Sequence, residues 1–174
     1  MIEMAIMRTN RLVLRQFHIG DVADLAELFA DPEVMRFGPG PQPRDFAERF
    51  CRGCLEDYHS KWGFGLWAIM YGDDRQMIGY CGLLVQEIEG RQEIELGYRL
   101  KNKFWGQGIA TEAAQASRDY GFQELGLKRL ISIIEPANVA SIRVAHKNGM
   151  RLESETTKWD KSVQVYAVHR SELP

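Results

Sequence analysis

Two glycines, Gly106 and Gly108, stand one residue apart between a strand-like segment and a helix-like segment. Residues 92–100 alternate apolar and polar side chains, which predicts a strand, whereas the alanine-rich residues 109–125 predict a helix. Glycine adopts backbone angles that other residues avoid and leaves room for a bulky group beside the main chain. The junction therefore indicates either a tight turn or a ligand site at the start of a helix.

Three strand-like segments precede the glycine pair, at residues 65–72, 77–88 and 92–100. The breaks between them, at residues 72–75 and 89–91, are short enough for hairpins. We therefore expect this part of the sheet to be antiparallel.

Helices and further strands flank these hairpins. Helix-like patterns cover residues 20–31, 45–59, 109–125 and 138–149, and strand-like patterns cover residues 11–17, 128–135, 150–159 and 161–170. Asp21 is suited to cap the first helix, and Asn138 the last. The order of elements predicts an α+β fold with a mixed, mostly antiparallel sheet of about seven strands flanked by about four helices.

Composition narrows the class of protein. The chain has 174 residues and a formal net charge of −2, which fits one domain over residues 1–174 without a broad basic surface. We expect no nucleic-acid partner. Because no apolar run approaches the ~20 residues that span a bilayer and no signal layout opens the chain, we also expect a cytoplasmic protein without membrane contact.

The cysteines and histidines give no metal pattern. Cys51 and Cys54 form a C-x-x-C pair, but a zinc site needs a second pair and Cys81 stands alone. The four histidines are scattered. We therefore expect two thiols on a helix face, and no metal.

Three ligand sites use closely spaced glycines. A dinucleotide fingerprint needs Gly or Ala where Thr111 stands, and a P-loop needs a lysine that the sequence lacks. The third is a diphosphate cradle of main-chain N–H groups at a helix start, where the helix dipole also attracts anions. Lys101, Lys103 and Arg99 stand nearby and could complement the anionic charge.

Several motifs in order carry a resemblance to a known family. Residues 103–110, KFWGQGIA, resemble the acyl-CoA pyrophosphate loop of the GNAT N-acetyltransferase superfamily, with Lys103 where the family usually has Gln or Arg. Residues 137–153, ANVASIRVAHKNGMRLE, resemble its second cofactor motif. The stretches RTNRLVLRQF, DPEVMRF, ELGYRL and YGFQELGLKRL are similar to the RimJ/RimL-type branch, so the resemblance covers a core of about residues 8–170.

The resemblance implies a GNAT fold and an enzyme that moves an acetyl group from acetyl-CoA to a primary amine by direct attack. The acceptor would be a protein N-terminal α-amine or a small-molecule amine. By the same analogy, main-chain groups of β-strand residues near Tyr98 would pair with the pantetheine arm. The implied cofactor-binding residues are Tyr98, Leu100, Lys103, Trp105, Gly106, Gln107, Gly108, Ile109, Ala110, Thr111 and Asn138.

Glu95 and Ser141 are the candidate catalytic residues. Glu95 lies beside the side-chain-free Gly97, which leaves open space next to a carboxylate and suits a general base. Many GNAT enzymes use a tyrosine acid where Ala145 stands here, so we expect Ser141, four residues earlier on the helix, to donate to the leaving thiolate. A solvated strand carboxylate and a helix-capping serine remain the alternative interpretations.

Two other functions stay open at this point. The missing tyrosine is compatible with a non-catalytic acyl-CoA-binding module, which would bind the cofactor without turnover. A nicotinamide-dependent oxidoreductase would instead bind NAD and not CoA. The sequence also leaves a homodimer open.

Overall fold

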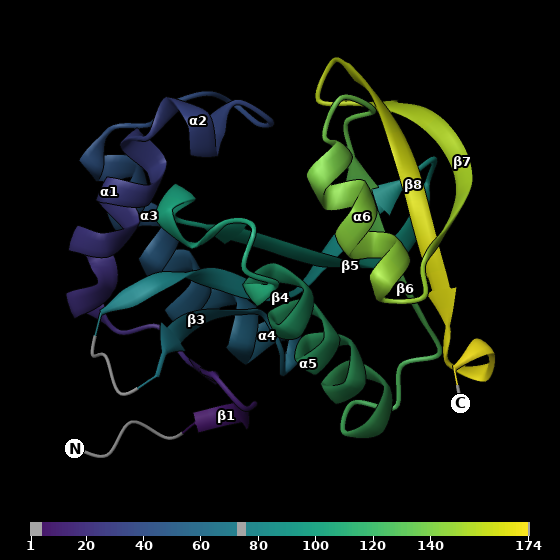
Figure 1. The fold of residues 1–174 in the computed structure, drawn as a ribbon, viewed down its shortest axis with the longest axis horizontal. Coiled ribbons are helices and arrows are strands. Elements are labelled where there is room, and N and C mark those ends of the chain that lie inside the picture. Colours follow the sequence, from purple (N-terminus) through teal and green to yellow (C-terminus); the bar gives the residue numbers. More distant parts are fainter. Residues whose placement is uncertain (1–4, 73–75, 174) are drawn as a thin grey trace.

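The computed structural model describes residues 5–72 and 76–173, within which eight strands form one sheet (Figure 1). The strand order is β1-β2-β3-β4-β5-β6-β8-β7, and all neighbours are antiparallel except β5 and β6. The strands are β1 (Ala5–Arg8), β2 (Leu12–Arg15), β3 (Leu66–Tyr71), β4 (Met77–Ile88), β5 (Arg91–Leu100), β6 (Arg129–Ile134), β7 (Arg151–Lys158) and β8 (Lys161–His169).

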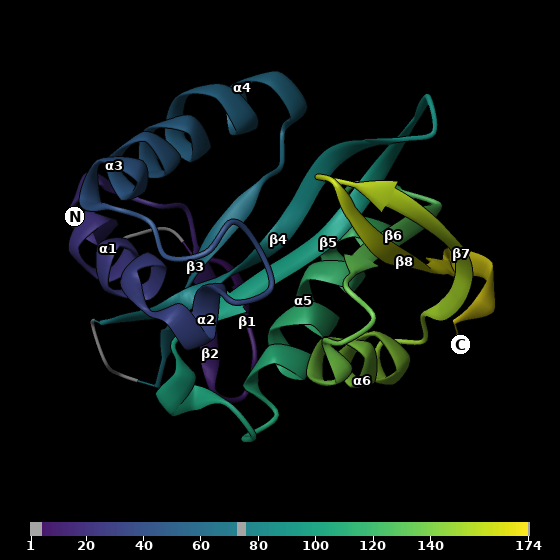
Figure 2. The same cartoon turned by 90° about the horizontal axis from the view of Figure 1, so that it is seen from above.

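Helices cover both faces of this sheet (Figure 2). They are α1 (Val22–Ala30), α2 (Pro32–Met35), α3 (Arg44–Gly53), α4 (His59–Trp62), α5 (Ile109–Gln123) and α6 (Val139–Lys147). Helices α5 and α6 pack on one face with Trp67 and Ile69, whereas α1 and α3 pack on the other with Leu66 and Ala68. Since side chains of a strand alternate between faces, β3 contributes to both cores.

The sequence prediction missed β1 and divided the second helix differently. Strand β1 is a short edge strand beside β2, which raises the number of strands from about seven to eight. Helix α3 ends at Gly53, and the chain continues through a π-helical turn, Cys54–Tyr58, into α4. Residues 73–75 of the hairpin break predicted at residues 72–75 lie outside the described residues, but the strands that the break joins, β3 and β4, do pair antiparallel.

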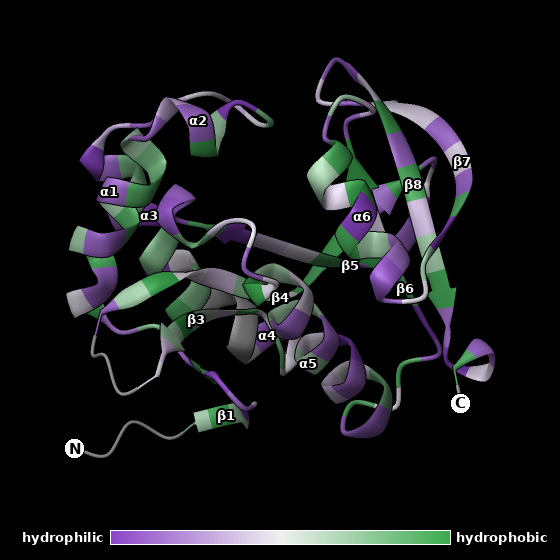
Figure 3. Ribbon diagram, viewed as in Figure 1, coloured by the Kyte–Doolittle hydropathy of each residue, from purple (hydrophilic) through white to green (hydrophobic). Residues whose placement is uncertain are grey.

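The edge strand β7 differs in polarity from its neighbour β8 (Figure 3). Hydrophobic and hydrophilic residues alternate along β8, whereas the edge strand β7 is mostly hydrophilic and exposed. Charged side chains on an edge strand discourage pairing with another chain.

The parallel pair β5 and β6 diverges almost at once. Their register contains one residue pair, Glu95 with Ile131, and one step later the Ser132 hydroxyl donates to the Leu96 carbonyl at 2.8 Å. Beyond Leu96, β5 continues without β6 beside it. The sheet is therefore open along the edge of β5 that leads to the glycine loop.

Asp21 does not cap α1, contrary to the sequence prediction. Its side chain makes no capping bond to α1; it accepts two hydrogen bonds from Arg15, both at 2.8 Å, and one from the His18 N–H at 2.9 Å. Both charged side chains are almost fully buried. The Asp21 carboxylate pairs with Arg15 rather than capping α1, because a buried guanidinium without a charged partner would cost several kcal/mol of stability.

Replacing Arg15 by Met tests this buried pair. The change strands the Asp21 carboxylate, so we expect the free energy of unfolding in urea to fall by about 3–5 kcal/mol. Arg49→Met, which removes a partner of exposed Asp45, is the control and should stay close to wild type. Equal stability of the two variants would contradict the assignment.

Candidate functional site

The glycine loop joins β5 to α5 through a short 3₁₀ turn, Asn102–Phe104. Gly106 and Gly108 have φ angles of +71° and +77°, a region that favours glycine. The first helical bond of α5 runs from the Glu112 N–H to the Gly108 carbonyl at 3.0 Å, so the N–H groups of residues 109–111 precede it and have no helical partner. These donors, together with the helix dipole, form a site for an anion.

The main chain of the loop is accessible. Gly106 and Gly108 are exposed, and a Cβ placed on Gly106 would meet nothing within 4 Å. Trp105 is 46% exposed, and its indole N–H donates to the Leu100 carbonyl at 3.0 Å. The Gln107 side-chain amide donates to the Lys103 carbonyl at 3.0 Å. These local contacts shape the loop and leave the N–H groups at the helix start free of them.

The predicted residues at the helix start have separate roles in the structure. Ile109 is buried in the core, whereas Ala110 and Thr111 are partly exposed in the first turn. Ile109 thus anchors the helix through its side chain, and any contact it makes with a ligand would come from its main chain.

Arg11 holds the glycine loop, and the sequence analysis did not identify it. Its guanidinium donates to the Gln107 carbonyl at 3.0 Å and to the Glu112 carboxylate at 2.7 Å. Thr9 donates to the same carboxylate at 2.6 Å. Burial alone would raise the pKa of Glu112, but the bonds from Thr9 and Arg11 lower it. The RTNRLVLRQF resemblance was the one signal in the sequence that could have pointed to this segment.

Two of the cations expected near the loop are occupied elsewhere. Lys101 is buried, and its ammonium pairs with Asp24 at 2.8 Å and with Glu27. Arg99 donates to the Val34 carbonyl at 2.7 Å and to the Tyr80 hydroxyl at 3.2 Å. Both side chains fasten β5 to the α1–α2 segment, so the prediction that they complement an anion at the loop was wrong.

Lys103 remains available beside the loop. Its side chain is exposed, with the ammonium 5.3 Å from the centre of the Phe104 ring. Of the three cations that the sequence suggested, Lys103 alone has neither an ion pair nor a side-chain hydrogen bond within the described part of the chain.

The open edge of β5 presents main-chain groups toward the gap. The Lys101 N–H donates to the Ile78 carbonyl of β4 at 2.9 Å. Main-chain N–H and C=O groups point alternately to the two sides of a strand, so those of Leu96, Tyr98 and Leu100 point away from β4. The Ser132 hydroxyl donates a hydrogen bond to the Leu96 carbonyl, and the Trp105 indole N–H donates one to the Leu100 carbonyl. The Tyr98 N–H and C=O and the Leu100 N–H therefore face the gap, where an extended ligand could add as a strand.

Glu95 lies where β5 and β6 separate. It is only 9% exposed, and the Gln86 side-chain amide donates to its carboxylate at 2.7 Å. Burial raises the pKa of Glu95, and hydrogen bonds from Gln86 and the Ile133 main chain oppose this rise. The alternative of a solvated strand carboxylate does not fit this environment, whereas a raised pKa suits a general base.

Ser141 of α6 and Tyr98 of β5 are in contact through their side chains. The Tyr98 hydroxyl donates to Ser141 Oγ at 3.0 Å. Asn138 caps α6 as expected, because its side-chain oxygen accepts from the Ser141 N–H at 3.2 Å. Ser141 thus donates its main-chain N–H to the capping residue, while its hydroxyl lies toward β5.

Comparison with known proteins identifies the family. The model of the acetyltransferase (GNAT) domain matches residues 11–151. Uncharacterized protein YkkB of Bacillus subtilis (strain 168) is 35% identical over 159 residues, which cover 91% of this chain and 92% of that protein. The chain belongs to the GNAT acetyltransferase family. It is an acetyl-CoA-dependent acetyltransferase, with acetyl-CoA as co-substrate.

Solved GNAT structures share the fold. An acetyltransferase from Agrobacterium tumefaciens str. C58 superposes with a TM-score of 0.82 at 29% identity, over 98% of this chain and 97% of that one. RimL, a ribosomal L7/L12 alpha-N-protein acetyltransferase in complex with coenzyme A, gives 0.79 at 21% identity, over 95% and 98%. The expected RimJ/RimL-type likeness is thus confirmed at the level of the fold.

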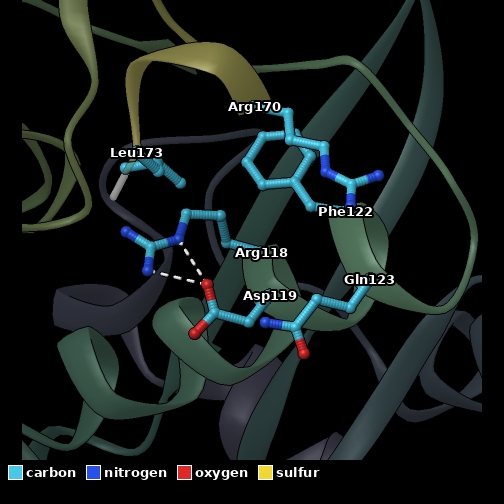
Figure 4. A pocket seen from close by; sticks show the side chains of 6 residues that line it. All are labelled: Arg118, Asp119, Phe122, Gln123, Arg170 and Leu173. Carbon is cyan, nitrogen blue, oxygen red and sulfur yellow. Dashed lines mark hydrogen bonds and ion pairs between the residues drawn. The ribbon is translucent and has the colours of Figure 1, made fainter.

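A cavity of about 480 Å³ in this GNAT chain has none of the predicted site residues in its lining (Figure 4). It is lined by Arg118, Asp119, Phe122, Gln123, Arg170 and Leu173. The Arg118 guanidinium is already bound to Asp119 at 2.7 Å and to the Asn148 carbonyl at 2.9 Å. The bond to Asn148 joins α5 to the end of α6. Because the Arg118 guanidinium is engaged in these contacts, we assign the cavity no role in acetyl transfer.

The C-x-x-C pair of the sequence lies in the protein core. Cys51 and Cys54 are buried free thiols whose pKa values burial raises to about 11 and about 12, which makes them poor ligands and nucleophiles. No cluster of His, Cys, Asp or Glu that could hold a metal ion occurs among the described residues. No helix in that part of the chain is long and apolar enough to cross a membrane.

Arg11→Met tests the support of the glycine loop. Removing the guanidinium frees the Gln107 carbonyl and the Glu112 carboxylate, so we expect the Kd for CoA to rise about tenfold, as loss of charge-assisted hydrogen bonds implies. Isothermal titration calorimetry measures the change. Arg8→Met, an exposed arginine of the same N-terminal segment, is the control. An unchanged Kd for the Arg11 variant would show that the loop holds its shape alone.

Proposed function

We propose that this GNAT enzyme acetylates a primary amine by direct attack on acetyl-CoA, and that the glycine loop and the open edge of β5 bind the cofactor. One observation carries the proposal: the unpartnered N–H groups at the start of α5 continue, through Trp105, into the free main-chain groups of β5. The path ends beside Glu95 and Ser141. A diphosphate at one end and a thioester at the other fit this order of donors.

The proposal assigns the predicted binding residues to successive parts of this path. The N–H groups between Trp105 and Thr111 would bind the diphosphate, with Lys103 as a nearby cation. The Tyr98 and Leu100 main chain would pair with the pantetheine amides as an added strand would. Asn138, at the start of α6 across the gap, would contact the same arm while it caps the helix.

The chemistry follows from the groups at the end of the path. A neutral amine attacks the thioester carbon; the C–N bond forms and the amine proton passes to Glu95, directly or through water. The Tyr98 N–H stabilises the oxyanion. As the C–S bond breaks, sulfur keeps the electron pair, and the Ser141 hydroxyl donates a hydrogen bond to the thiolate.

The acceptor is best matched by a protein N-terminal α-amine. At pH 7, deprotonation costs about 1 kcal/mol for an α-amine with a pKa of ~7.8 and roughly 4.6 kcal/mol for a lysine amine of ~10.4. A carboxylate such as Glu95 is adequate for the smaller cost. RimL, named for acetylation of an alpha-amino group of a ribosomal protein, supports testing N-terminal peptides first. Small-molecule amines are the second class.

A non-catalytic acyl-CoA-binding module, which the sequence left open, is the weaker proposal because the chain belongs to an acetyltransferase family. It is favoured by Ala145, a buried residue that has no hydroxyl to donate at the position of the usual acid. Release of free thiol from acetyl-CoA, measured with N-terminal peptides, amino acids, polyamines and aminoglycosides, separates the two. Binding of CoA without turnover on any amine would favour the module.

Gly106→Ala tests the diphosphate cradle. The added methyl group has space in the protein but stands where the ligand would approach, so we expect the Kd for CoA to rise at least tenfold. Gly126→Ala is the matched control, because Gly126 has a φ of +67° and equally open surroundings. Both variants should lose similar stability in thermal denaturation. Equal CoA affinity for the two would argue against the cradle.

Glu95→Gln tests the general base through its pH dependence. Because burial raises the pKa of Glu95, the wild-type kcat/KM should fall as pH decreases through that raised value, where the base becomes protonated. The variant should lose roughly 100-fold in kcat near neutral pH and less as pH approaches the pKa of the amine. Glu93→Gln is the control, because Glu93 lies on the same strand as Glu95 but its carboxylate pairs with Arg129. A pH profile of the Glu95 variant that matches wild type would remove Glu95 from the mechanism.

A further inference from the structure

The hydrogen bond between Tyr98 and Ser141 joins two elements that are far apart in the sequence. Tyr98 comes from β5 and Ser141 from the first turn of α6, and the two oxygens lie 3.0 Å apart with the phenol as donor. The Tyr98 ring packs against the core on the α5–α6 face. Burial raises the pKa of Tyr98 to about 12, so the phenol stays a neutral donor at physiological pH.

We propose that Tyr98 is a positioning residue that directs the Ser141 hydroxyl hydrogen toward the sulfur of coenzyme A. The inference rests on the proposed function, in which Ser141 stabilises the leaving thiolate. It adds a side-chain role to a residue whose main chain faces the pantetheine path.

The count of donors and acceptors explains how this works. A serine hydroxyl has one hydrogen and two lone pairs, and a donor that occupies a lone pair leaves the hydrogen to find another acceptor. In a helix that acceptor is commonly the carbonyl one turn earlier, which would turn the hydrogen away from a ligand. The bond from Tyr98 draws Ser141 Oγ toward β5, and it also polarises the Ser141 O–H.

The position of the pair matches the end of the cofactor path. The Tyr98 main chain faces the gap between β5 and β6, and the Tyr98 side chain reaches Ser141 at the start of α6. Sulfur that arrives along the Tyr98 main chain would meet the Ser141 hydroxyl. Ala145, one turn further along α6, is buried and offers no donor of its own.

The thiol of bound CoA reports on this arrangement directly. Thiolate absorbs in the far ultraviolet, so a pH titration of the complex gives the thiol pKa without any acceptor amine. In the wild-type protein we expect this pKa to lie below that of free CoA, by a roughly tenfold increase in the ionisation constant. Ser141→Ala should return it to the free value, Tyr98→Phe should move it part of the way, and the double variant should match Ser141→Ala.

Steady-state kinetics provide the second readout. Tyr98→Phe should lower kcat roughly tenfold and Ser141→Ala roughly 100-fold, with little change in the KM for acetyl-CoA, because the thiolate forms only in the reaction. Tyr166→Phe is the control, since it removes a buried tyrosine hydroxyl that donates to Gln164 at 3.0 Å. Its bound-thiol pKa and kcat should equal those of wild type.

The possible outcomes distinguish this inference from the proposed function. A wild-type bound-thiol pKa in Tyr98→Phe, or independent effects that add in the double variant, would overturn the role of Tyr98 while acetylation of an amine stands. The expected thiol shifts without turnover on any of the tested amines would support the Tyr98–Ser141 pair and reject the proposed amine acceptors.

Discussion

The divergence of β5 from β6 is the constraint on which the rest of the site depends. Two parallel strands that stayed paired to their ends would use every main-chain group between them. Here the ladder stops after Glu95 and Ile131, and the Ser132 hydroxyl takes the next carbonyl in place of a strand N–H. Further along, the Trp105 indole takes the Leu100 carbonyl. Side-chain donors thus close both ends of an interval whose centre, at Tyr98, stays free.

The gap persists because other contacts hold β5 on its opposite side. Strand β4 pairs with β5 along ten residue pairs, and the buried ammonium of Lys101 ties the end of β5 to Asp24 and Glu27 of α1. Arg99 adds bonds to the segment after α1. With β5 fixed from that side, its free edge is preorganised for a ligand, which reduces the ordering that binding would otherwise require.

The sequence predicted what depends on local patterns and missed what depends on distant pairing. Strands β4 and β5, helix α5, the Asn138 cap and the positive φ angles at Gly106 and Gly108 follow from periodicity and residue type over a few positions. Lys101 is instead paired with residues of α1 that lie 74 and 77 positions earlier in the chain, and Arg11 reaches partners in the loop and α5 that lie 96 and 101 positions later. Asp21 shows the same limit, because its role was decided by Arg15 rather than by the helix that it precedes.

The alternation of side chains along β5 separates the two proton-handling groups of the proposed reaction. Glu95 and Tyr98 stand an odd number of residues apart, so they project to opposite faces of the sheet, toward α1–α3 and toward α5–α6 respectively. An amine that delivers its proton to Glu95 would approach from one face, while the thiolate would leave toward Ser141 on the other. The gap between β5 and β6 is what allows one thioester to contact both faces. A continuous sheet would place the base and the donor on two surfaces that no single carbonyl could reach, and for that reason the open strand edge matters as much to the chemistry as it does to cofactor binding.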